Sequence, residues 1–154
     1  VEVTPEGNII VSGLTIMSGY VADEENTRKV LKDGKIYGSD LGYVDDEGLI
    51  HLKGRQGDVI NVGGFKVDPS EVENAAASHD SVKDCICIAG THPVIGTALK
   101  LLVVLADGAS LDKRSLALHL KSKLEPHKIP TYYESVESIQ RTYNGKLDRK
   151  FYKK

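Results

Sequence analysis

The chain has 154 residues, enough for one ordinary domain with its own hydrophobic core. Apolar residues make up 40% and charged residues 27% of the sequence, as in globular proteins. A net charge of −2 argues against a general affinity for nucleic acid. No run approaches the roughly 18 apolar residues that a membrane span needs, and no cleavable leader is visible. We therefore expect neither a nucleic-acid partner nor a membrane span.

The first part of the chain, to about residue 53, predicts a small β-rich piece. Apolar runs bounded by Gly and Asp predict short strands at 8–11, 14–17, 35–37, 41–44 and 49–52. Residues 45–48 are a turn signal, so the last two runs form a hairpin. One short helix is expected at about 24–31. So small a piece buries little apolar surface, and we expect it to be marginally stable alone.

After Gly57 the pattern changes to alternating strands and helices. Asp68 is suited to cap a helix to about Ser78, with Pro69 at its first position and Glu71 three residues after the cap. A second helix opens at Leu111 and Asp112 and ends before 125–130, where proline interrupts it. Leu116, Leu120 and Leu124 recur in it at helical spacing. Apolar strands are expected at 82–89, 99–106 and 132–136, and a last turn at 147–152. The prediction is a small α+β domain with flanking helices and a mostly antiparallel sheet.

Two cysteines, Cys85 and Cys87, fall on one face of an expected strand. A disulfide between residues i and i+2 has poor geometry. A zinc site would need two more well-spaced ligands, and His79 and His92 do not supply that spacing. We therefore expect buried free thiols, no metal site, and a reducing, cytoplasmic location.

The most informative stretch is 54–67, where glycines alternate with a short β-branched run. Gly57 and the Gly63-Gly64 pair free the backbone where the chain must turn or let a ligand approach closely. Val59, Ile60 and Val62 favour an extended strand. The stretch predicts a mobile joint that leads into a short strand and a tight loop.

Together with 37–48 and 144–150, this stretch resembles the adenylate-forming superfamily of acyl- and aryl-CoA synthetases, peptide-synthetase adenylation domains and luciferases. The segment 17–20 with Thr27 also fits, so the resemblance covers nearly the whole chain. It implies that residues 56–154 are a mobile C-terminal lid domain. Residues 1–55 would then be the β-rich end of a large N-terminal domain. That domain's phosphate-binding loop is absent from the sequence, so we expect an inactive fragment of a longer enzyme.

The resemblance implies roles for three residues in nucleotide binding. Asp40, expected in a loop after a strand, would hold the two ribose hydroxyls of ATP or AMP, and Arg55 would bind ribose and phosphate oxygens. Lys66 would approach the α-phosphate. The alternatives are a turn-capping aspartate, a surface salt bridge and a solvated lysine, respectively.

The resemblance also implies roles in the two chemical steps. Lys146 would be the catalytic cation of adenylation, unless it is one more cation of a basic tail. Gly63 and Gly64 would line the channel for the pantetheine arm of CoA. Gly57 stands where the family has its hinge, usually an aspartate or lysine, and the alternative is a glycine that sits in a left-handed turn. Asn61 replaces the lysine that luciferases use there, which argues for thioester formation.

The expected reaction joins a carboxylic acid to CoA through an acyl-adenylate, with ATP consumed and Mg²⁺ accompanying it. An adenylation domain that loads the phosphopantetheine of a carrier protein is the alternative, and a non-catalytic relative is a third possibility. Retention of Asp40, Arg55 and Lys146 together argues against the third. The acyl group stays open among fatty acids, acetate, aromatic acids and succinylbenzoate.

Overall fold

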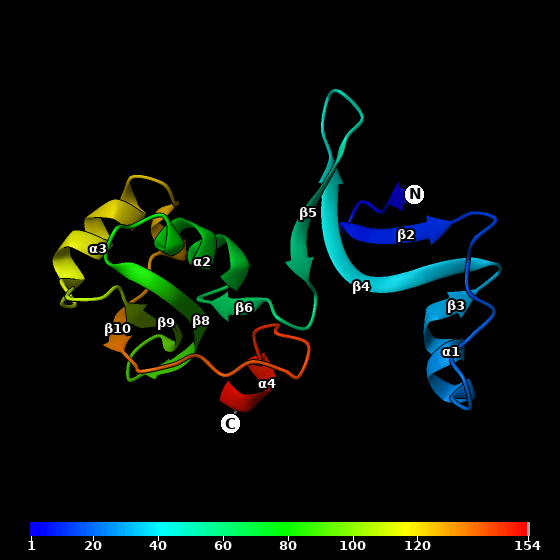
Figure 1. Cartoon of the computed structure of the whole chain (residues 1–154). Coiled ribbons are helices and arrows are strands. Elements are labelled where there is room, and N and C mark those ends of the chain that lie inside the picture. The colour runs from blue at the N-terminus through cyan, green and yellow to red at the C-terminus, as the bar shows by residue number, and fades with distance from the viewer. Residues whose placement is uncertain (154) are drawn as a thin grey trace. The chain divides into compact units, whose positions relative to one another are not determined.

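The computed structural model describes residues 1–153 of the chain (Figure 1). The chain divides after Gly57 into two compact units, Val1–Gly57 and Asp58–Lys154. Among the described residues, no helix combines the length and apolarity that a bilayer crossing requires.

The first unit is an antiparallel sheet with one short helix. Its strands are β1 (Glu2–Val3), β2 (Asn8–Ser12), β3 (Leu31–Lys32), β4 (Lys35–Val44) and β5 (Ile50–Arg55). The strand order is β1-β2-β4-β3, and β5 also pairs with β4. Helix α1 (Glu24–Val30) is capped at its start by Asp23, whose carboxylate accepts a hydrogen bond from the Asn26 amide at 3.1 Å.

The predicted hairpin between β4 and β5 is confirmed. Tyr43 lies opposite His51 in the antiparallel register. One carboxylate oxygen of Asp45 accepts from the amides of Glu47 and Leu49, at 3.0 and 2.8 Å. Gly48 has a φ of 81°, which glycine adopts without steric cost. The turn residues therefore fix the register of the pairing.

The prediction of a strand at residues 14–17 is wrong. These residues lie outside every strand, and Leu14 is fully exposed. The Ile16 amide donates to the Gly13 carbonyl at 3.4 Å, which is a turn contact and not a strand pairing. A run of apolar residues becomes a strand only where a neighbouring strand takes up its backbone hydrogen bonds, and none does so here.

The second unit is a three-stranded sheet between helices, with a separate small hairpin. The sheet contains β8 (Val82–His92), β9 (Gly96–Leu105) and β10 (Tyr132–Ser135), and the hairpin contains β6 (Ile60–Val62) and β7 (Phe65–Val67). β8 runs antiparallel to β9, whereas β10 runs parallel to it. A parallel neighbour needs a crossover connection, which is supplied by α3 (Lys113–Lys121) and the short 3-10 helix η1 (Pro126–Lys128).

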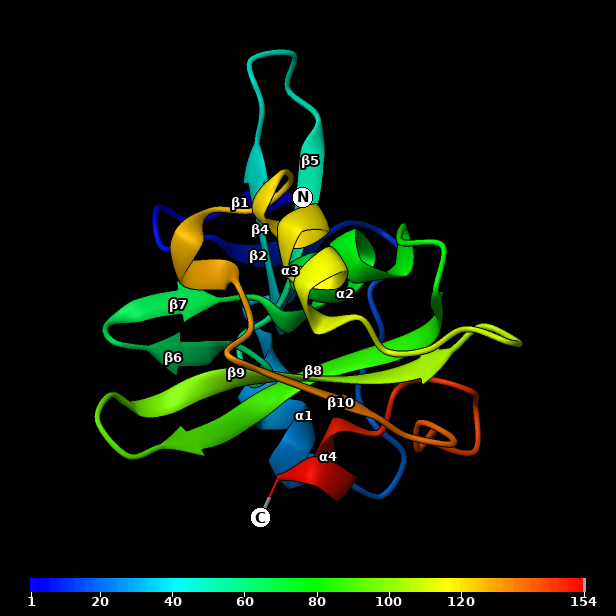
Figure 2. The same ribbon diagram turned by 90° about the vertical axis from the view of Figure 1, so that its left-hand side faces the viewer.

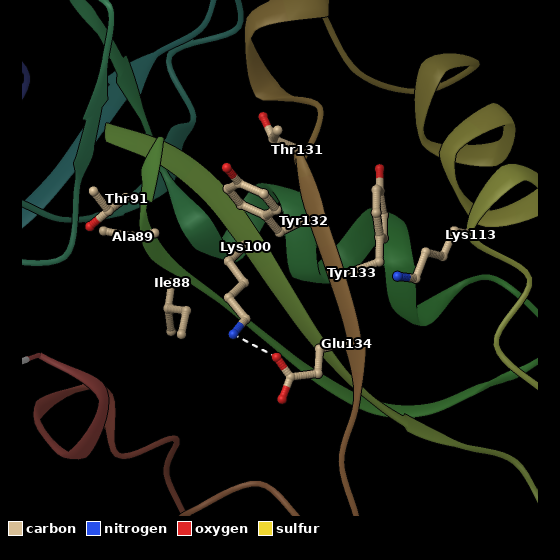
Figure 3. Close-up of a pocket in the computed structure, with 10 residues that line it drawn as sticks. Ile88, Ala89, Thr91, Lys100, Lys113, Thr131, Tyr132, Tyr133 and Glu134 are labelled. Atoms are coloured by element: carbon tan, nitrogen blue, oxygen red, sulfur yellow. Dashed lines mark ion pairs between the residues drawn. The ribbon is translucent and has the colours of Figure 1, made fainter. Parts of the chain in front are cut away.

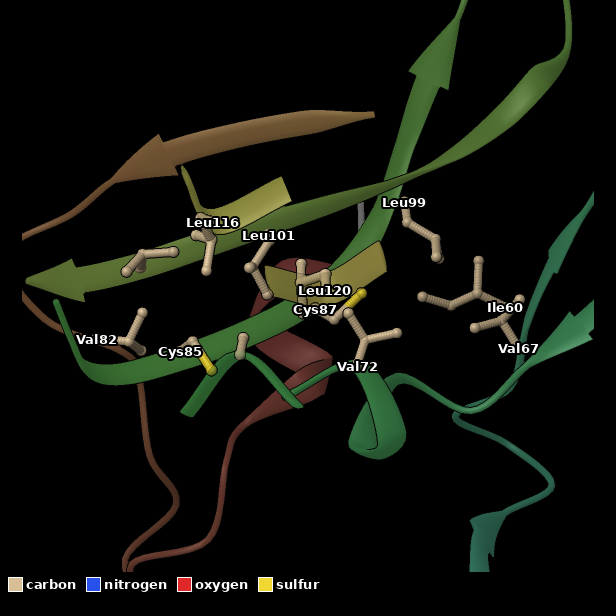
Figure 4. Packing of buried hydrophobic residues seen from close by; sticks show 12 residues of the cluster. Ile60, Val67, Val72, Val82, Cys85, Cys87, Leu99, Leu101, Leu116 and Leu120 are labelled. Atoms are coloured by element: carbon tan, nitrogen blue, oxygen red, sulfur yellow. The ribbon is translucent and has the colours of Figure 1, made fainter. Parts of the chain in front are cut away.

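Helices α2 (Pro69–Ala77) and α3 pack on one face of this sheet, and α4 (Arg149–Tyr152) lies on the other side (Figure 2). Leu116 and Leu120 of α3 and Val72 of α2 meet the strand residues Leu99 and Leu101 in the main core (Figure 4). On the other face, Ile86 and Leu102 form a smaller cluster with Ile139, against which Leu147 and Tyr152 pack.

The predicted start of α2 is confirmed, with one exception. The Asp68 carboxylate accepts from the Ser70 amide at 2.9 Å, and Pro69 occupies the first turn. Glu71 does not complete a capping box, because its carboxylate instead binds the Lys128 ammonium group at 2.8 Å. That contact fastens η1 to α2.

The expected free thiols are also confirmed, since Cys85 and Cys87 are both buried and unpaired. Burial, with the charge of Glu73 adding to it, raises the pKa of Cys85 to about 12 and that of Cys87 further still.

We predict that replacing Leu120 by alanine lowers the free energy of unfolding by about 2–5 kcal/mol, because the side chain is fully buried. Leu118→Ala in the same helix is the matched control. Its side chain is 58% exposed, so the expected loss is within about 0.5 kcal/mol. Urea unfolding of both variants checks this, and equal losses would contradict the assigned core.

We predict that neither cysteine reacts with a disulfide-exchange reagent such as DTNB at pH 8 while the chain is folded. The thiolate is the reactive form, and burial both hides it and raises the thiol pKa. Both thiols should react in denaturant. Rapid labelling of the folded chain would show that this strand is not buried as described.

Candidate functional site

Lys146 lies at the end of a tight turn and is exposed. The Thr142 amide donates to the Lys146 carbonyl at 2.8 Å, and the Gly145 amide donates to the Thr142 carbonyl at 2.9 Å. Gly145 has a φ of 80°, which suits glycine at this place. The Lys146 ammonium group has no ion-pair partner among residues 1–153. The turn therefore offers a fixed backbone and an uncommitted cation.

An arginine anchors the start of this turn. One guanidinium nitrogen of Arg141 donates to the Gly145 carbonyl at 2.9 Å, and the other donates to the Asp84 carboxylate at 2.6 Å. Asp84 belongs to β8, so the turn is tied to the central sheet. A fork of donors that spans two acceptors restrains orientation as well as distance.

A second arginine anchors the end of the turn. Arg149 holds the Glu73 carboxylate with two hydrogen bonds of 2.7 Å each. Glu73 is only 7% exposed, although it is charged. The same carboxylate accepts from the Cys87 amide at 2.7 Å, and Arg149 also donates to the Cys87 carbonyl at 3.4 Å. Burial alone would lower the pKa of Arg149, but hydrogen bonds and charge from Glu73 outweigh it and raise that pKa.

The pairing of Glu73 with Arg149 was not predicted from the sequence. Its two residues are 76 positions apart, and such pairing leaves no local pattern. One signal was present, since Glu73 follows Val72 and precedes Ala76 on the buried side of a predicted helix. A charged residue at that position calls for a buried partner.

Gly63 and Gly64 form the two-residue turn between β6 and β7. Their φ angles are 57° and 93°, and a type I′ hairpin turn requires positive φ at both central residues. The Asn61 side chain accepts from the Gly64 amide at 3.0 Å. Lys66 pairs with Asn61 across the hairpin and is exposed. The expected strand and tight loop are thus confirmed.

Asp40 and Arg55 lie side by side in the first unit. The expectation that Asp40 sits in a loop is wrong, because it lies within β4 and faces Arg55 of β5 in register. Arg55 Nε donates to Asp40 Oδ1 at 3.0 Å, and both side chains are about half exposed, 59% and 50%. The strand continues through Asp40 because β5 supplies the pairing.

The predicted site residues thus fall into separate places. Asp40 and Arg55 form one pair in the first unit, and Gly57 ends that unit. In the second unit, Figure 2 shows the β6–β7 hairpin well apart from α4 and the segment before it, which carries Lys146. Gly57 does not have a positive φ, so a left-handed turn does not explain this glycine.

A surface pocket in the second unit contains none of the predicted site residues (Figure 3). It lies along β8, β9 and β10, where Lys100 pairs with Glu134 at 2.6 Å. Tyr132 lies against Gly90, which leaves room for the ring.

A family model for the C-terminal domain of AMP-binding enzymes matches residues 71–146. Among curated proteins, a long-chain-fatty-acid–CoA ligase of Bacillus subtilis is 35% identical over 144 residues, covering 94% of this chain and 26% of the ligase. A feruloyl-CoA synthase of an Amycolatopsis species is 35% identical over 142 residues, covering 92% of this chain and 29% of the synthase. The chain therefore spans between a quarter and a third of the length of these relatives.

This chain is also similar to solved structures. An o-succinylbenzoate CoA synthetase from Bacillus subtilis, in complex with its acyl-adenylate intermediate, matches 100% of this chain and 31% of its own, with a TM-score of 0.90 and 27% identity. An amide bond synthetase from Marinactinospora thermotolerans matches 95% of this chain and 30% of its own, with a TM-score of 0.84 and 33% identity.

We predict that Gly64→Ala lowers the free energy of unfolding by about 1–2 kcal/mol, because a side chain at positive φ meets the backbone. Gly57→Ala is the control, since its φ is not positive, and we expect a change within about 0.5 kcal/mol. Thermal or urea unfolding measures both. The reverse order of effects would contradict the described turn.

Proposed function

The chain belongs to the adenylate-forming superfamily, and residues 71–146 match the C-terminal domain of AMP-binding enzymes. We propose that it supplies the mobile lid of an ATP-dependent acyl-CoA synthetase. The observation that carries the proposal is the exposed, uncommitted Lys146 on a turn anchored at both ends. The reaction would convert a carboxylic acid, ATP and CoA into an acyl-CoA, AMP and pyrophosphate.

The rest of the active site would lie on a large N-terminal domain in cis. Supporting this, the chain spans only 26% and 29% of the two curated ligases, and its sequence holds no phosphate-binding loop. Under this proposal, residues 1–55 complete that large domain and residues 56–154 form the lid. The chain by itself would be inactive.

Lys146 would serve the first step. A carboxylate oxygen of the acid attacks the α-phosphorus of ATP, the bond to pyrophosphate breaks, and negative charge grows on the leaving group. A positioned cation stabilises that charge more in the transition state than in the ground state. The turn meets this need, because its backbone is fixed while the ammonium group stays exposed.

Asp40 and Arg55 would bind the nucleotide. An ion pair between half-exposed side chains is worth only about 0–1 kcal/mol, so ribose hydroxyls can replace it at little cost. The Asp40 carboxylate would accept from both hydroxyls, and Arg55 would turn its remaining donors to ribose or phosphate oxygens. Lys66, exposed on β7, would approach the α-phosphate.

Magnesium would arrive with the phosphates of ATP. Within the part of the chain that the structure describes, no group of three or more His, Cys, Asp or Glu side chains could hold a metal ion. We therefore propose no ligand for magnesium among the described residues of this chain.

The β6–β7 turn would serve the second step, in which a thiol attacks the acyl carbon and AMP leaves. Gly63 and Gly64 carry no side chains, so a pantetheine arm can pass close to their backbone. Because this turn and Lys146 lie on different parts of the second unit, one pose of the lid cannot present both. Rotation at Gly57 would exchange them.

CoA is the proposed acceptor, and the thiol of a carrier protein is the alternative. The relatives at 35% identity are CoA ligases by name, which supports CoA. The likeness to an amide bond synthetase adds an amine as an acceptor to be tested. Adenylation is common to all three possibilities, so only the second step separates them.

We predict that Lys146→Ala in the intact enzyme slows adenylation by about 10²–10³-fold, because it removes one charged stabilising group. Thioester formation from supplied acyl-adenylate should be unchanged. Carboxylate-dependent pyrophosphate exchange, with a panel of acids, measures the first step, and release of AMP on adding CoA measures the second.

Lys150→Ala is the matched control, since this exposed lysine lies four residues further on and has no proposed role. It should leave both steps unchanged. Equal loss of both steps in Lys146→Ala, or equal losses in the two variants, would overturn the role given to Lys146.

A further inference from the structure

Asp58 is the first residue of the second unit, and it is tied to the last helix of the chain. One oxygen of its carboxylate lies 3.5 Å from Arg149 Nε, and the other lies 3.3 Å from Lys153 Nζ. The Asp58 side chain is 28% exposed and that of Arg149 is 14% exposed, so solvent screens this contact only in part. Ninety-five positions of sequence separate Asp58 from Lys153.

The helix beside these contacts, α4, would not be stable in isolation. α4 has four residues, far fewer than an isolated helix needs in water. Contacts with the rest of the unit stabilise α4. They are the ion pair between Arg149 and Glu73 and a hydrogen bond of 3.0 Å from the Gln140 amide to the Tyr152 hydroxyl. Asp58 adds the contact nearest to the joint.

The path from Asp58 to Lys146 is short. Asp148 caps α4 by accepting from the Lys150 and Phe151 amides at 3.1 and 3.2 Å. The Asp148 amide in turn donates to the Gln140 carbonyl at 3.0 Å, next to Arg141, which anchors the turn. A displacement of α4 therefore shifts the end of the turn that carries Lys146.

Glu73 alone already neutralises Arg149, so Asp58 is not needed to balance that charge. What Asp58 adds is a link between the residue that follows Gly57 and the segment that carries Lys146. We propose that Asp58 is a positioning residue for Lys146. Because of the contact of Asp58 with the last helix, Lys146 moves with the rest of the second unit, as one rigid body, when that unit rotates at the joint. This inference rests on the proposed role of Lys146 in adenylation.

The test uses the intact enzyme with Asp58→Asn, alone and combined with Lys146→Ala. Asparagine keeps the shape and removes the charge. We expect Asp58→Asn to slow pyrophosphate exchange by about 10- to 100-fold, as small misplacements of a catalytic group do. Thioester formation from supplied acyl-adenylate should not change. In the Lys146→Ala background, Asp58→Asn should have no further effect.

Asp107→Asn is the matched control, because Asp107 also pairs with a lysine, Lys83, but its side chain is 97% exposed. It should leave both steps unchanged. Asp58→Ala, which removes the acceptors entirely, should repeat the effect of Asp58→Asn more strongly. A loss shared equally by both steps, a loss that multiplies with that of Lys146→Ala, or no loss in either Asp58 variant would overturn the proposal.

Hydrogen exchange separates this proposal from the proposed function. Asp58→Asn should speed exchange of the amides of Thr142, Gly145 and Phe151, whatever Lys146 does, because the contact that restrains α4 is lost. Unchanged exchange would overturn the positioning role. If exchange is faster but Lys146→Ala leaves adenylation intact, the tether stands and the function proposed for Lys146 fails.

Discussion

The buried ion pair between Glu73 and Arg149 is the interaction on which the second unit most depends. β8 is an edge strand, and an edge strand leaves backbone donors and acceptors without partners. The pair satisfies the N–H and the C=O of Cys87 at this edge while it neutralises its own charges. Removing one member would leave the other charged and buried, which typically costs about 3–5 kcal/mol.

The same pair joins the two ends of the second unit. Glu73 belongs to α2, near the start of the unit, and Arg149 opens α4, at its end. The turn that carries Lys146 is thus held to β8 by Arg141 and to α2 by Arg149. A single anchor would leave a hinged loop, whereas two anchors fix the place from which the lysine extends.

Two separate loops on one compact unit would suit the proposed reaction, which has two steps. In the proposed reaction, a cation would be useful while pyrophosphate departs and would not be needed when the thiol attacks. Under the proposed function, turning one body at Gly57 would exchange the two loops without rebuilding either. Glycine would absorb the backbone change easily, and the contact of Asp58 with Arg149 would keep the unit intact beyond the joint.

Local chemistry made much of the fold predictable. Asp68 with Pro69 started a helix, residues 45–48 closed a hairpin, and the Gly63-Gly64 pair formed a two-residue turn, because each depends on nearby backbone. The strand at 14–17 failed because strands need partners that the local sequence does not reveal. The placement of Asp40 failed for the converse reason, since β5 extends β4 through it. The partnership of Glu73 with Arg149 depends on the folded chain. The sequence signalled only that Glu73, on the buried side of a predicted helix, needs a partner, and not which residue supplies it.

The central claim is that the unit beyond Gly57 turns as one body between two poses. Pulsed electron paramagnetic resonance tests it directly, with spin labels at Glu47 and Tyr143 of the intact enzyme. Both positions are exposed, and the native Cys85 and Cys87 are buried away from the label. The account predicts one distance with a non-hydrolysable ATP analogue and a clearly different one with an acyl-adenylate analogue and CoA. An identical distance distribution in both states would contradict it.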